Sequence, residues 1–277
     1  MTDTNKAVFI RHKMSTTPEI LEDLWRRREI AIHYENKCST NPDDYREKAA
    51  KNALKRLHAY CNMGVVVGAV YREIRPADIL VGIITQGSKV RPINRYGDDN
   101  IYKVVQLQNV KEISLADYPL LAAIQPRLAT ITGWTGAFDL LYSIAFDKTV
   151  PIDVKYLSPG QLEVICQEYL RMKGILKVLL LPIGRNLQDI DIFGIGDDGY
   201  KVLAQVTHSN QLSKVDSKLQ MLKHYNRQGV KLILFGPESC NIADAKVNYI
   251  SIESVFAELQ SSQEAVYHQA IEMMFNR

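Results

Sequence analysis

Residues 189–208 constrain the fold of this chain more than any other stretch, because they predict two neighbouring strands and the turn between them. Aspartate alternates with isoleucine over 189–192, which is the pattern of a half-buried strand. An Asp-Asp-Gly sequence at 197–199 is typical of a tight hairpin turn. Residues 200–207 are again mostly apolar, so we expect them to pair with 189–195 as an antiparallel hairpin.

Polar side chains recur on both of these strands at positions that share a face. Because strand side chains alternate, Asp189 and Asp191 lie on one face of the first strand. Gln205 and Thr207 likewise lie on one face of the second strand. Carboxylate and amide carbonyl oxygens are ligands of hard divalent cations, so Asp191 and Gln205 are candidate metal ligands. The same pattern also fits an ordinary surface hairpin, in which a buried glutamine satisfies backbone groups.

The hairpin lies inside a longer series of helices and strands. Ser158 followed by proline is typical of a helix start, and an apolar stripe at helical spacing continues from it. A second amphipathic helix is predicted over 212–227. The strands of this half are expected at 177–181, 189–195, 200–207, 231–235 and 247–252. The resulting order of helix, three strands, helix and strand predicts an α/β domain with a mixed sheet flanked by helices.

This order, with an acid on the second strand and a polar pair on the third, resembles the PD-(D/E)xK (restriction endonuclease-like) superfamily over about residues 158–255. Within it, the Mrr-type branch, in which glutamine replaces the second acid, is the nearest likeness. Members cleave phosphodiester bonds with Mg²⁺ or a similar ion such as Mn²⁺. The resemblance implies that Asp191 and Gln205 bind the metal and that Thr207 stands where the family has lysine. Glu163, on the first helix of this half, matches a position where some relatives have another acid and is an implied third ligand.

The departure from the family pattern lies at Thr207, whose side chain carries no charge and cannot replace an ammonium group. Two interpretations stay open. Lys214 or Lys218, on the polar face of the following helix, reaches back into the site and acts as the catalytic cation. Alternatively, the domain keeps the fold, has lost catalysis and only binds its ligand. His208 is a weaker substitute, because alternation points it to the opposite face.

The first half of the chain is predicted to be an α+β domain with an open β-barrel-like arrangement. Helices are expected over 17–28 and 43–60, the first with Thr17 as N-cap. Short strands are expected at 29–34, 64–71, 79–85 and 102–110. Several short strands with one or two helices are typical of a small, open barrel.

These elements faintly resemble PUA-like and EVE-like domains over about residues 8–115. Such domains accept a modified or flipped base in an aromatic-lined cleft. Flipped bases are held by stacking on aromatic rings, so the resemblance implies a nucleic-acid-binding role for four residues. They are Trp25, His33, Tyr34 and Tyr71. Each also fits the commoner role of an ordinary aromatic residue in the core or at its rim.

Charge and cysteine content narrow the function classes. A net charge of +3, from 34 basic and 31 acidic residues, neither demands nor excludes nucleic acid. Four widely separated cysteines argue against a zinc site or a disulfide framework. No apolar run is long enough to span a membrane and the first residues lack a signal peptide's apolar core, so we expect a cytoplasmic protein. Basic groups that favour a polyanionic partner occur at 26–28, at Lys48, Lys51, Lys55 and Arg56, and at Lys89, Arg91 and Arg95.

The sequence therefore predicts two domains, a PUA/EVE-like nucleic-acid-reading domain over 1–146 and a restriction-endonuclease-like domain over 147–277. The expected function is Mg²⁺- or Mn²⁺-dependent cleavage of DNA, modified or foreign, in a restriction or defence role. The alternative is a catalytically inactive nucleic-acid-binding protein with the same fold. RNA stays open as a partner, because PUA-like barrels serve both nucleic acids. A homodimer is a mild expectation for a nuclease that cuts both strands.

Overall fold

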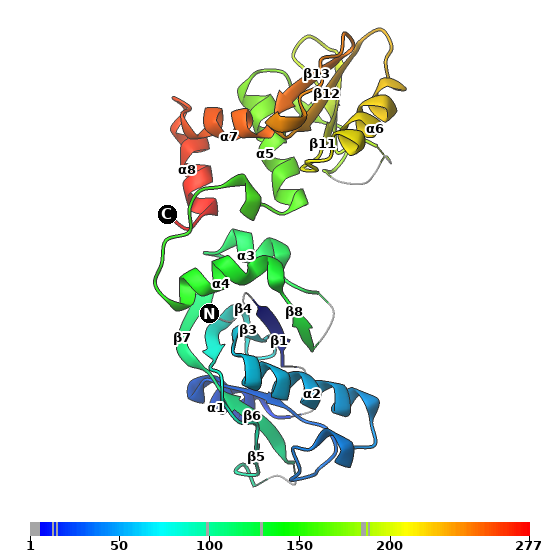
Figure 1. Ribbon diagram of the computed structural model, residues 1–277. Coiled ribbons are helices and arrows are strands. Elements are labelled where there is room, and N and C mark those ends of the chain that lie inside the picture. The colour runs from blue at the N-terminus through cyan, green and yellow to red at the C-terminus, as the bar shows by residue number, and fades with distance from the viewer. Residues whose placement is uncertain are drawn as a thin grey trace. The chain divides into compact units, whose positions relative to one another are not determined.

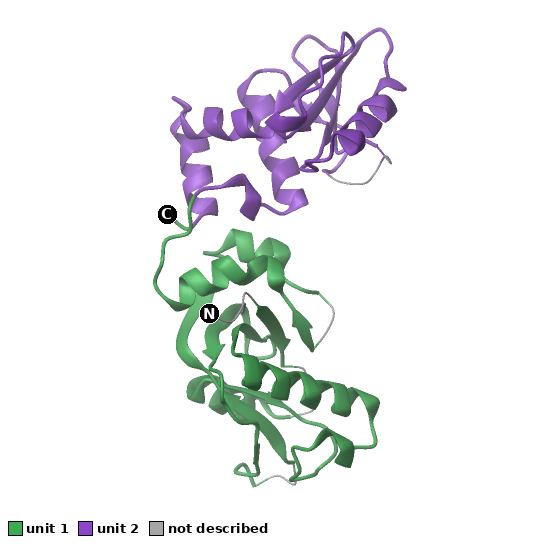
Figure 2. Ribbon diagram, in the orientation of Figure 1, with its two compact units in different colours: residues 1–151, 276 green, residues 152–275, 277 purple. Residues whose placement is uncertain are grey.

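Residues 1–151, with 276, and residues 152–275, with 277, fold as two units, each with its own sheet system (Figure 2). The sequence predicts the division after residue 146. The structure is a computed structural model of the chain. It describes residues 6–12, 14, 16–97, 100–127, 130–183, 187 and 189–277. Among these residues, no helix has the length and apolar character needed to cross a membrane.

Unit 1 contains a five-stranded sheet and a three-stranded sheet (Figure 1). In the larger sheet β1 and β3 are parallel and all other neighbours are antiparallel. Its order is β7 (Gln108–Ser114), β4 (Arg75–Ile84), β3 (Val65–Tyr71), β1 (Ala7–Arg11) and β8 (Ile131–Gly133). The smaller, antiparallel sheet has the order β2 (Glu29–Ile32), β6 (Tyr102–Gln106) and β5 (Arg91–Ile93). The expected barrel-like strands are thus divided between two sheets, and neither closes into a barrel among the described residues.

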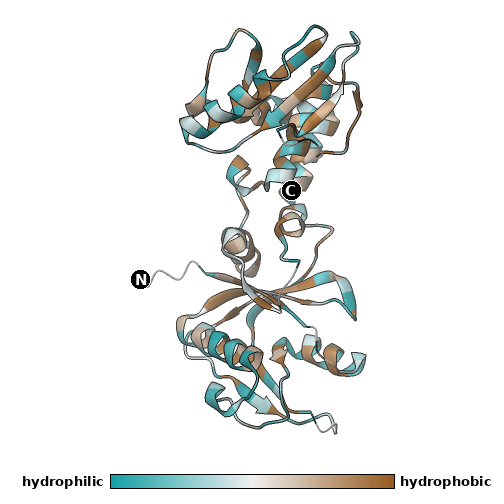
Figure 3. Ribbon diagram, turned by 90° about the vertical axis from the view of Figure 1, so that its right-hand side faces the viewer, coloured by the Kyte–Doolittle hydropathy of each residue, from teal (hydrophilic) through white to brown (hydrophobic). Residues whose placement is uncertain are grey.

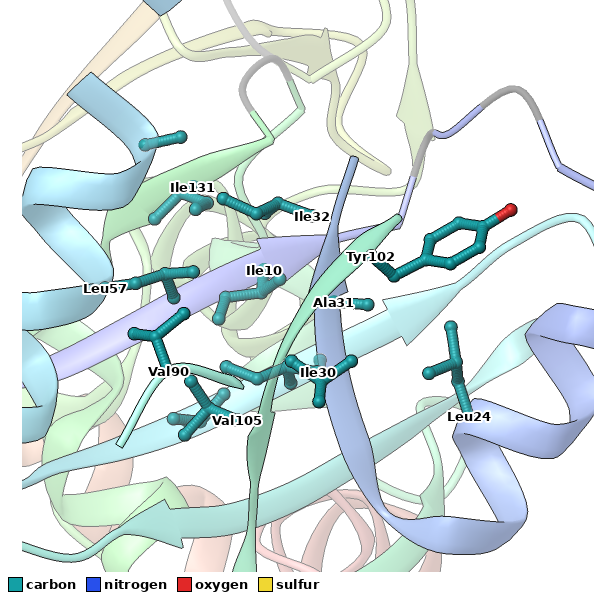
Figure 4. Packing of buried hydrophobic residues seen from close by; sticks show 14 of the residues in the cluster. Ile10, Leu24, Ile30, Ala31, Ile32, Leu57, Val90, Tyr102, Val105 and Ile131 are labelled. Atoms are coloured by element: carbon teal, nitrogen blue, oxygen red, sulfur yellow. The ribbon is translucent and has the colours of Figure 1, made fainter. Parts of the chain in front are cut away.

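One apolar core joins these two sheets to the helices of unit 1. Ile10 of β1, Ile30 of β2 and Leu57 of a long helix point toward one another in it (Figure 4). The helices of unit 1 are α1 (Pro18–Arg27), α2 (Lys48–Met63), α3 (Pro119–Ile124) and α4 (Phe138–Ala145), with short 3-10 turns at Pro42–Asp44 and Thr135–Ala137. As predicted, α1 begins after Thr17 with proline in its first turn. The sequence gives no regular element over 119–134, where α3 and β8 are found.

Unit 2 is built on one five-stranded mixed sheet. Its order is β13 (Val247–Ser251), β12 (Val230–Gly236), β11 (Lys201–Val206), β10 (Ile192–Ile195) and β9 (Val178–Leu179). The strands β9, β10 and β11 are antiparallel, whereas β11, β12 and β13 are parallel. Helix α5 (Pro159–Met172) precedes β9, and α6 (Leu212–Lys223) connects β11 to β12. The chain continues through α7 (Ile252–Gln260) and α8 (Ala265–Met274), with 3-10 turns at Val154–Tyr156 and Glu238–Cys240.

The two connecting helices cover opposite faces of this sheet. On α5, Tyr169 meets Phe235 of β12 edge-on, with ring centroids 6.3 Å apart. Helix α6 lies on the other face, where Leu219 belongs to a core that contains Leu203 of β11 and Leu234 of β12. The strands are mostly apolar and the helices carry both apolar and polar residues (Figure 3). This distribution is what helices that bury one side against a sheet require.

The start of α5, where the sequence predicts a cap at Ser158, carries a complete capping box. Ser158 Oγ accepts the Gln161 backbone N–H at 3.3 Å, and Gln161 Oε1 accepts the Ser158 N–H at 3.0 Å. Ser158→Ala is expected to lower the free energy of unfolding by about 1 kcal/mol, measured by urea denaturation. Ser213→Ala, at an exposed position in the first turn of α6 that is not a cap, is the matched control. Equal effects of the two substitutions would contradict the capping role.

Candidate functional site

Asp191 lies directly before β10, where the regular β10–β11 ladder has ended with Ile192 opposite Ala204. Its N–H donates to the Ala204 carbonyl at 3.0 Å. Its carboxylate oxygen Oδ2 accepts the N–H of Val206 at 2.8 Å. Within the described part of the chain, Oδ1 has no hydrogen-bond partner. The carboxylate is therefore fixed at the end of the two strands with one oxygen free for a ligand.

Gln205, the residue before Val206 on β11, has a side chain that is only 5% exposed. Alternation puts it on the face of Leu203, the face that α6 covers. Its carbonyl oxygen Oε1 is buried and has no hydrogen-bond partner among the described residues. An unpartnered buried acceptor costs about 1–3 kcal/mol. The amide oxygen is thus available to a ligand at the same end of β11 as Asp191.

Lys218 extends from α6 to the same end of β11. Its Nζ donates to the Val206 carbonyl at 3.2 Å. The N–H of Val206 is bonded to Asp191, so one residue's main chain holds both the carboxylate and the ammonium group. Lys214, one turn earlier on α6, is exposed, and its side chain has no ion pair or hydrogen bond within the described residues. The structure therefore separates two lysines that are equivalent in the sequence.

Thr207 does not supply a charge to this strand end. Thr207 is buried, its N–H bonds the Phe235 carbonyl at 2.9 Å, and its hydroxyl accepts the N–H of Ser209 at 3.3 Å. The threonine side chain thus shapes the turn that leads into α6. His208 is exposed.

Glu163 and Asp191 both lie near Cys166 of α5. Burial raises the pKa of the Cys166 thiol well above its usual range, and the negative charges of Asp191 and Glu163 raise it further. Over the described ranges, no group of three or more histidine, cysteine, aspartate and glutamate side chains has a metal-binding arrangement. A cation at this strand end would be held by the oxygens of Asp191 and Gln205, completed by water and phosphate oxygens, as is usual for Mg²⁺.

Two of the four aromatic residues predicted to bind nucleic acid lie in the core of unit 1. Trp25 is 4% exposed and Tyr71 is fully buried. Their rings meet edge-on at 5.4 Å, and the face of Tyr71 stacks on His12 at 3.7 Å. As they lie, these rings present no open face to a base, because Tyr71 stacks on His12 and the Arg75 guanidinium lies over the Trp25 ring at 5.5 Å.

His33 and Tyr34, at the end of β2, are partly buried. The His33 ring tilts against Tyr102 at 5.3 Å, and its Nδ1 lies 3.3 Å from the Ile101 carbonyl oxygen. Tyr34 packs against the core of unit 1. A base-binding role for these two residues remains a prediction.

Comparisons with known proteins add two similarities between structures. No protein-family model and no curated protein matches the chain. A structure described as a repair endonuclease from Pyrococcus abyssi is 12% identical, covering 80% of this chain and 98% of that chain, with a TM-score of 0.25. An EndoMS–dsDNA complex is also 12% identical, covering 65% of this chain and 69% of that chain, with a TM-score of 0.19. At these TM-scores, neither similarity carries an argument about this chain.

Proposed function

We propose that this protein is a metal-dependent DNA endonuclease of the PD-(D/E)xK kind, nearest to the Mrr-type branch, in which Lys218 takes the role of the lysine missing at Thr207. The observation that carries the proposal is the bonding of Val206, whose N–H donates to the Asp191 carboxylate and whose carbonyl accepts from the Lys218 ammonium group. The backbone N–H and carbonyl of one residue thus hold a carboxylate and an ammonium group close together, and phosphodiester hydrolysis uses such a pair of a metal-binding carboxylate and a cation.

The metal ligands of the proposed site are oxygens of unit 2. Asp191 Oδ1 and the orphaned Gln205 Oε1 fit a hard divalent cation by donor type. Glu163 is proposed as a third ligand on the resemblance alone, since α5 covers the face of the sheet opposite to that of Gln205. When bound, Mg²⁺ or Mn²⁺ would polarise the phosphate and lower the pKa of a coordinated water. The Val206 N–H orients the Asp191 carboxylate by holding its other oxygen.

Lys218 supplies positive charge to the scissile phosphate. Its ammonium group has no carboxylate partner in the described residues and is held only by a neutral carbonyl. A bond of this kind is readily exchanged for a charge-assisted bond to a phosphate oxygen. The long side chain allows that exchange without movement of α6. Lys218 would then stabilise the negative charge that develops on the phosphate in the transition state.

Lys218→Gln is expected to lower the rate of DNA cleavage about 10²–10³-fold. Removal of one preorganised hydrogen-bond donor to the transition state has an effect of this size in other enzymes. Lys214→Gln, which makes the same change on the same helix, is expected to leave the rate within about twofold. Both rates are measured by gel assay on duplex DNA with Mg²⁺ and with Mn²⁺. Equal loss in the two variants would show that neither lysine is specific to the site.

The alternative function, nucleic-acid binding without catalysis, has the uncharged and locally bonded Thr207 in its favour. Duplex binding by the wild type without cleavage in either metal would establish it. We further propose that the substrate is modified or foreign DNA and that the protein acts in restriction or defence. It is proposed to be a homodimer in the cytoplasm. Parallel assays on DNA and RNA substrates of one sequence distinguish the two nucleic acids.

A further inference from the structure

We infer that three lysines of α2 form a surface of unit 1 that binds the phosphate backbone of duplex DNA. The residues are Lys48, Lys51 and Lys55, here called the α2 stripe. The choice of DNA as the ligand rests on the proposed function, whereas the surface itself follows from the charges of unit 1.

The α2 stripe differs from other basic groups of unit 1 because its charges are not neutralised. Arg26 and Arg27 of α1 both bond Asp23, at 2.6 and 2.8 Å. Arg91 and Arg95 both bond the buried carboxylate of Glu29. No lysine of the α2 stripe has a carboxylate within ion-pair distance among the described residues. The stripe is therefore free to attract an anion.

Helical geometry places the three lysines on one side of α2. Figure 1 shows the helix within unit 1. They are spaced by three and four residues, so their side chains are neighbours on the helix surface. The buried residues of α2, such as Leu54 and Leu57, lie on the opposite side and face the core. Lys48 and Lys55 are exposed and Lys51 is partly exposed. The stripe spans about 10 Å along the axis, the length over which one DNA strand presents about three phosphates.

The charge pattern of α2 opposes the stability of the helix itself. Lys48 and Lys51 lie in its first turns, where one carboxylate, that of the N-cap residue Glu47, offsets the two positive charges in part and makes no cap bond. Cations near a helix N-terminus are destabilising, and so are like charges at three- and four-residue spacing. An anionic ligand across the stripe would relieve both effects.

The test measures binding of a fluorescent 30-bp DNA duplex by anisotropy between 50 and 200 mM salt, with EDTA present so that no cleavage occurs. Lys48→Gln/Lys51→Gln/Lys55→Gln is expected to weaken binding and to reduce the magnitude of the log–log salt slope by about 2.7. Over this fourfold range of salt, the wild type should then lose about 40-fold more affinity than the triple variant. The control is Lys148→Gln/Lys201→Gln/Lys246→Gln, three exposed lysines outside the basic groups named above, which removes the same net charge. Circular dichroism verifies that both triple variants are folded.

Each outcome decides the inference. A lower slope in the α2 variant alone supports it, even if the wild type cleaves no DNA, in which case only the proposed function fails. Equal slopes in the α2 variant and the wild type overturn it, even if cleavage is observed. Equal reduction in both triple variants also overturns it, because net charge alone then explains binding. If the α2 variant lowers the salt slope for an RNA duplex of the same sequence but not for DNA, the ligand of the stripe is RNA, and the inference as stated is overturned.

Discussion

Asp191→Asn is expected to reduce DNA cleavage by about 10³-fold or more while leaving the fold intact. Asparagine keeps a carbonyl oxygen that accepts the Val206 N–H, so the strand end is preserved. The substitution removes the negative charge that makes the side chain a good cation ligand. Loss of about 4 kcal/mol of metal-dependent stabilisation of the transition state corresponds to about 10³ in rate. Single-turnover cleavage of a duplex with saturating protein measures it.

Asp189→Asn is the matched control for this substitution. Asp189 lies two residues earlier, and the sequence pattern puts it on the same face of the strand as Asp191. Its substitution is expected to leave cleavage within about threefold, since no hydrogen bond or ion pair among the described residues ties its carboxylate to the strand end. Calorimetric titration with Mn²⁺ should show binding to the wild type and to Asp189→Asn, and much weaker binding to Asp191→Asn. Undiminished cleavage by Asp191→Asn would remove Asp191 from the site.

The second large effect is a loss of stability in acid caused by one buried histidine. His12, directly after β1, is 2% exposed. Its Nε2 accepts the Ala31 N–H at 3.0 Å, so Nδ1 carries the proton and donates to the Val70 carbonyl at 3.2 Å. Burial lowers the pKa of His12 from 6.5 to about 3, and the bond to Val70 offsets this only in part. The folded state therefore holds the neutral imidazole.

The direction of the pH effect follows from the proton balance. Between pH 6.5 and about 3 the unfolded chain binds a proton at His12 that the folded chain does not bind. The free energy of unfolding should therefore fall as the pH is lowered through this range and level off below it. The whole contribution is of the order of 5 kcal/mol. Urea denaturation at several pH values, compared with His12→Gln, isolates this contribution from those of the carboxylates.

His12→Gln keeps a donor and an acceptor but does not titrate, so its unfolding free energy should depend less on pH between 6.5 and 3. Direct titration of the imidazole by NMR gives a second measurement if this variant folds poorly. An NMR pKa near 6.5 for His12 in the folded protein would contradict the expectation.

Sequence reasoning succeeded where the signal was local. The serine and proline at the start of α5 predict a cap, and the capping box is found there. The Asp-Asp-Gly turn predicts a hairpin, and β10 and β11 pair antiparallel on either side of it. The short α3 and α4 were missed because helices of six and eight residues offer too few turns for periodicity to appear.

The composition of the site depended on packing that no local pattern encodes. Lys214 and Lys218 lie on the same polar side of a predicted helix, and only the docking of α6 over β11 decides which one reaches Val206. Trp25 and Tyr71 are candidates for stacking on a flipped base because they are aromatic. An aromatic side chain serves equally well in a core, and burial is a property of the fold.

The bonding of Val206 also has a consequence for the way this site tolerates change. What position 206 contributes to the strand end is its peptide N–H and carbonyl, which every residue except proline possesses in full. Substitution of the Val206 side chain tests only packing, because the backbone N–H and carbonyl are kept. An alanine scan would therefore not detect that Val206 joins Asp191 to Lys218. Backbone chemistry, such as replacement of the amide by an ester, is the means of probing it.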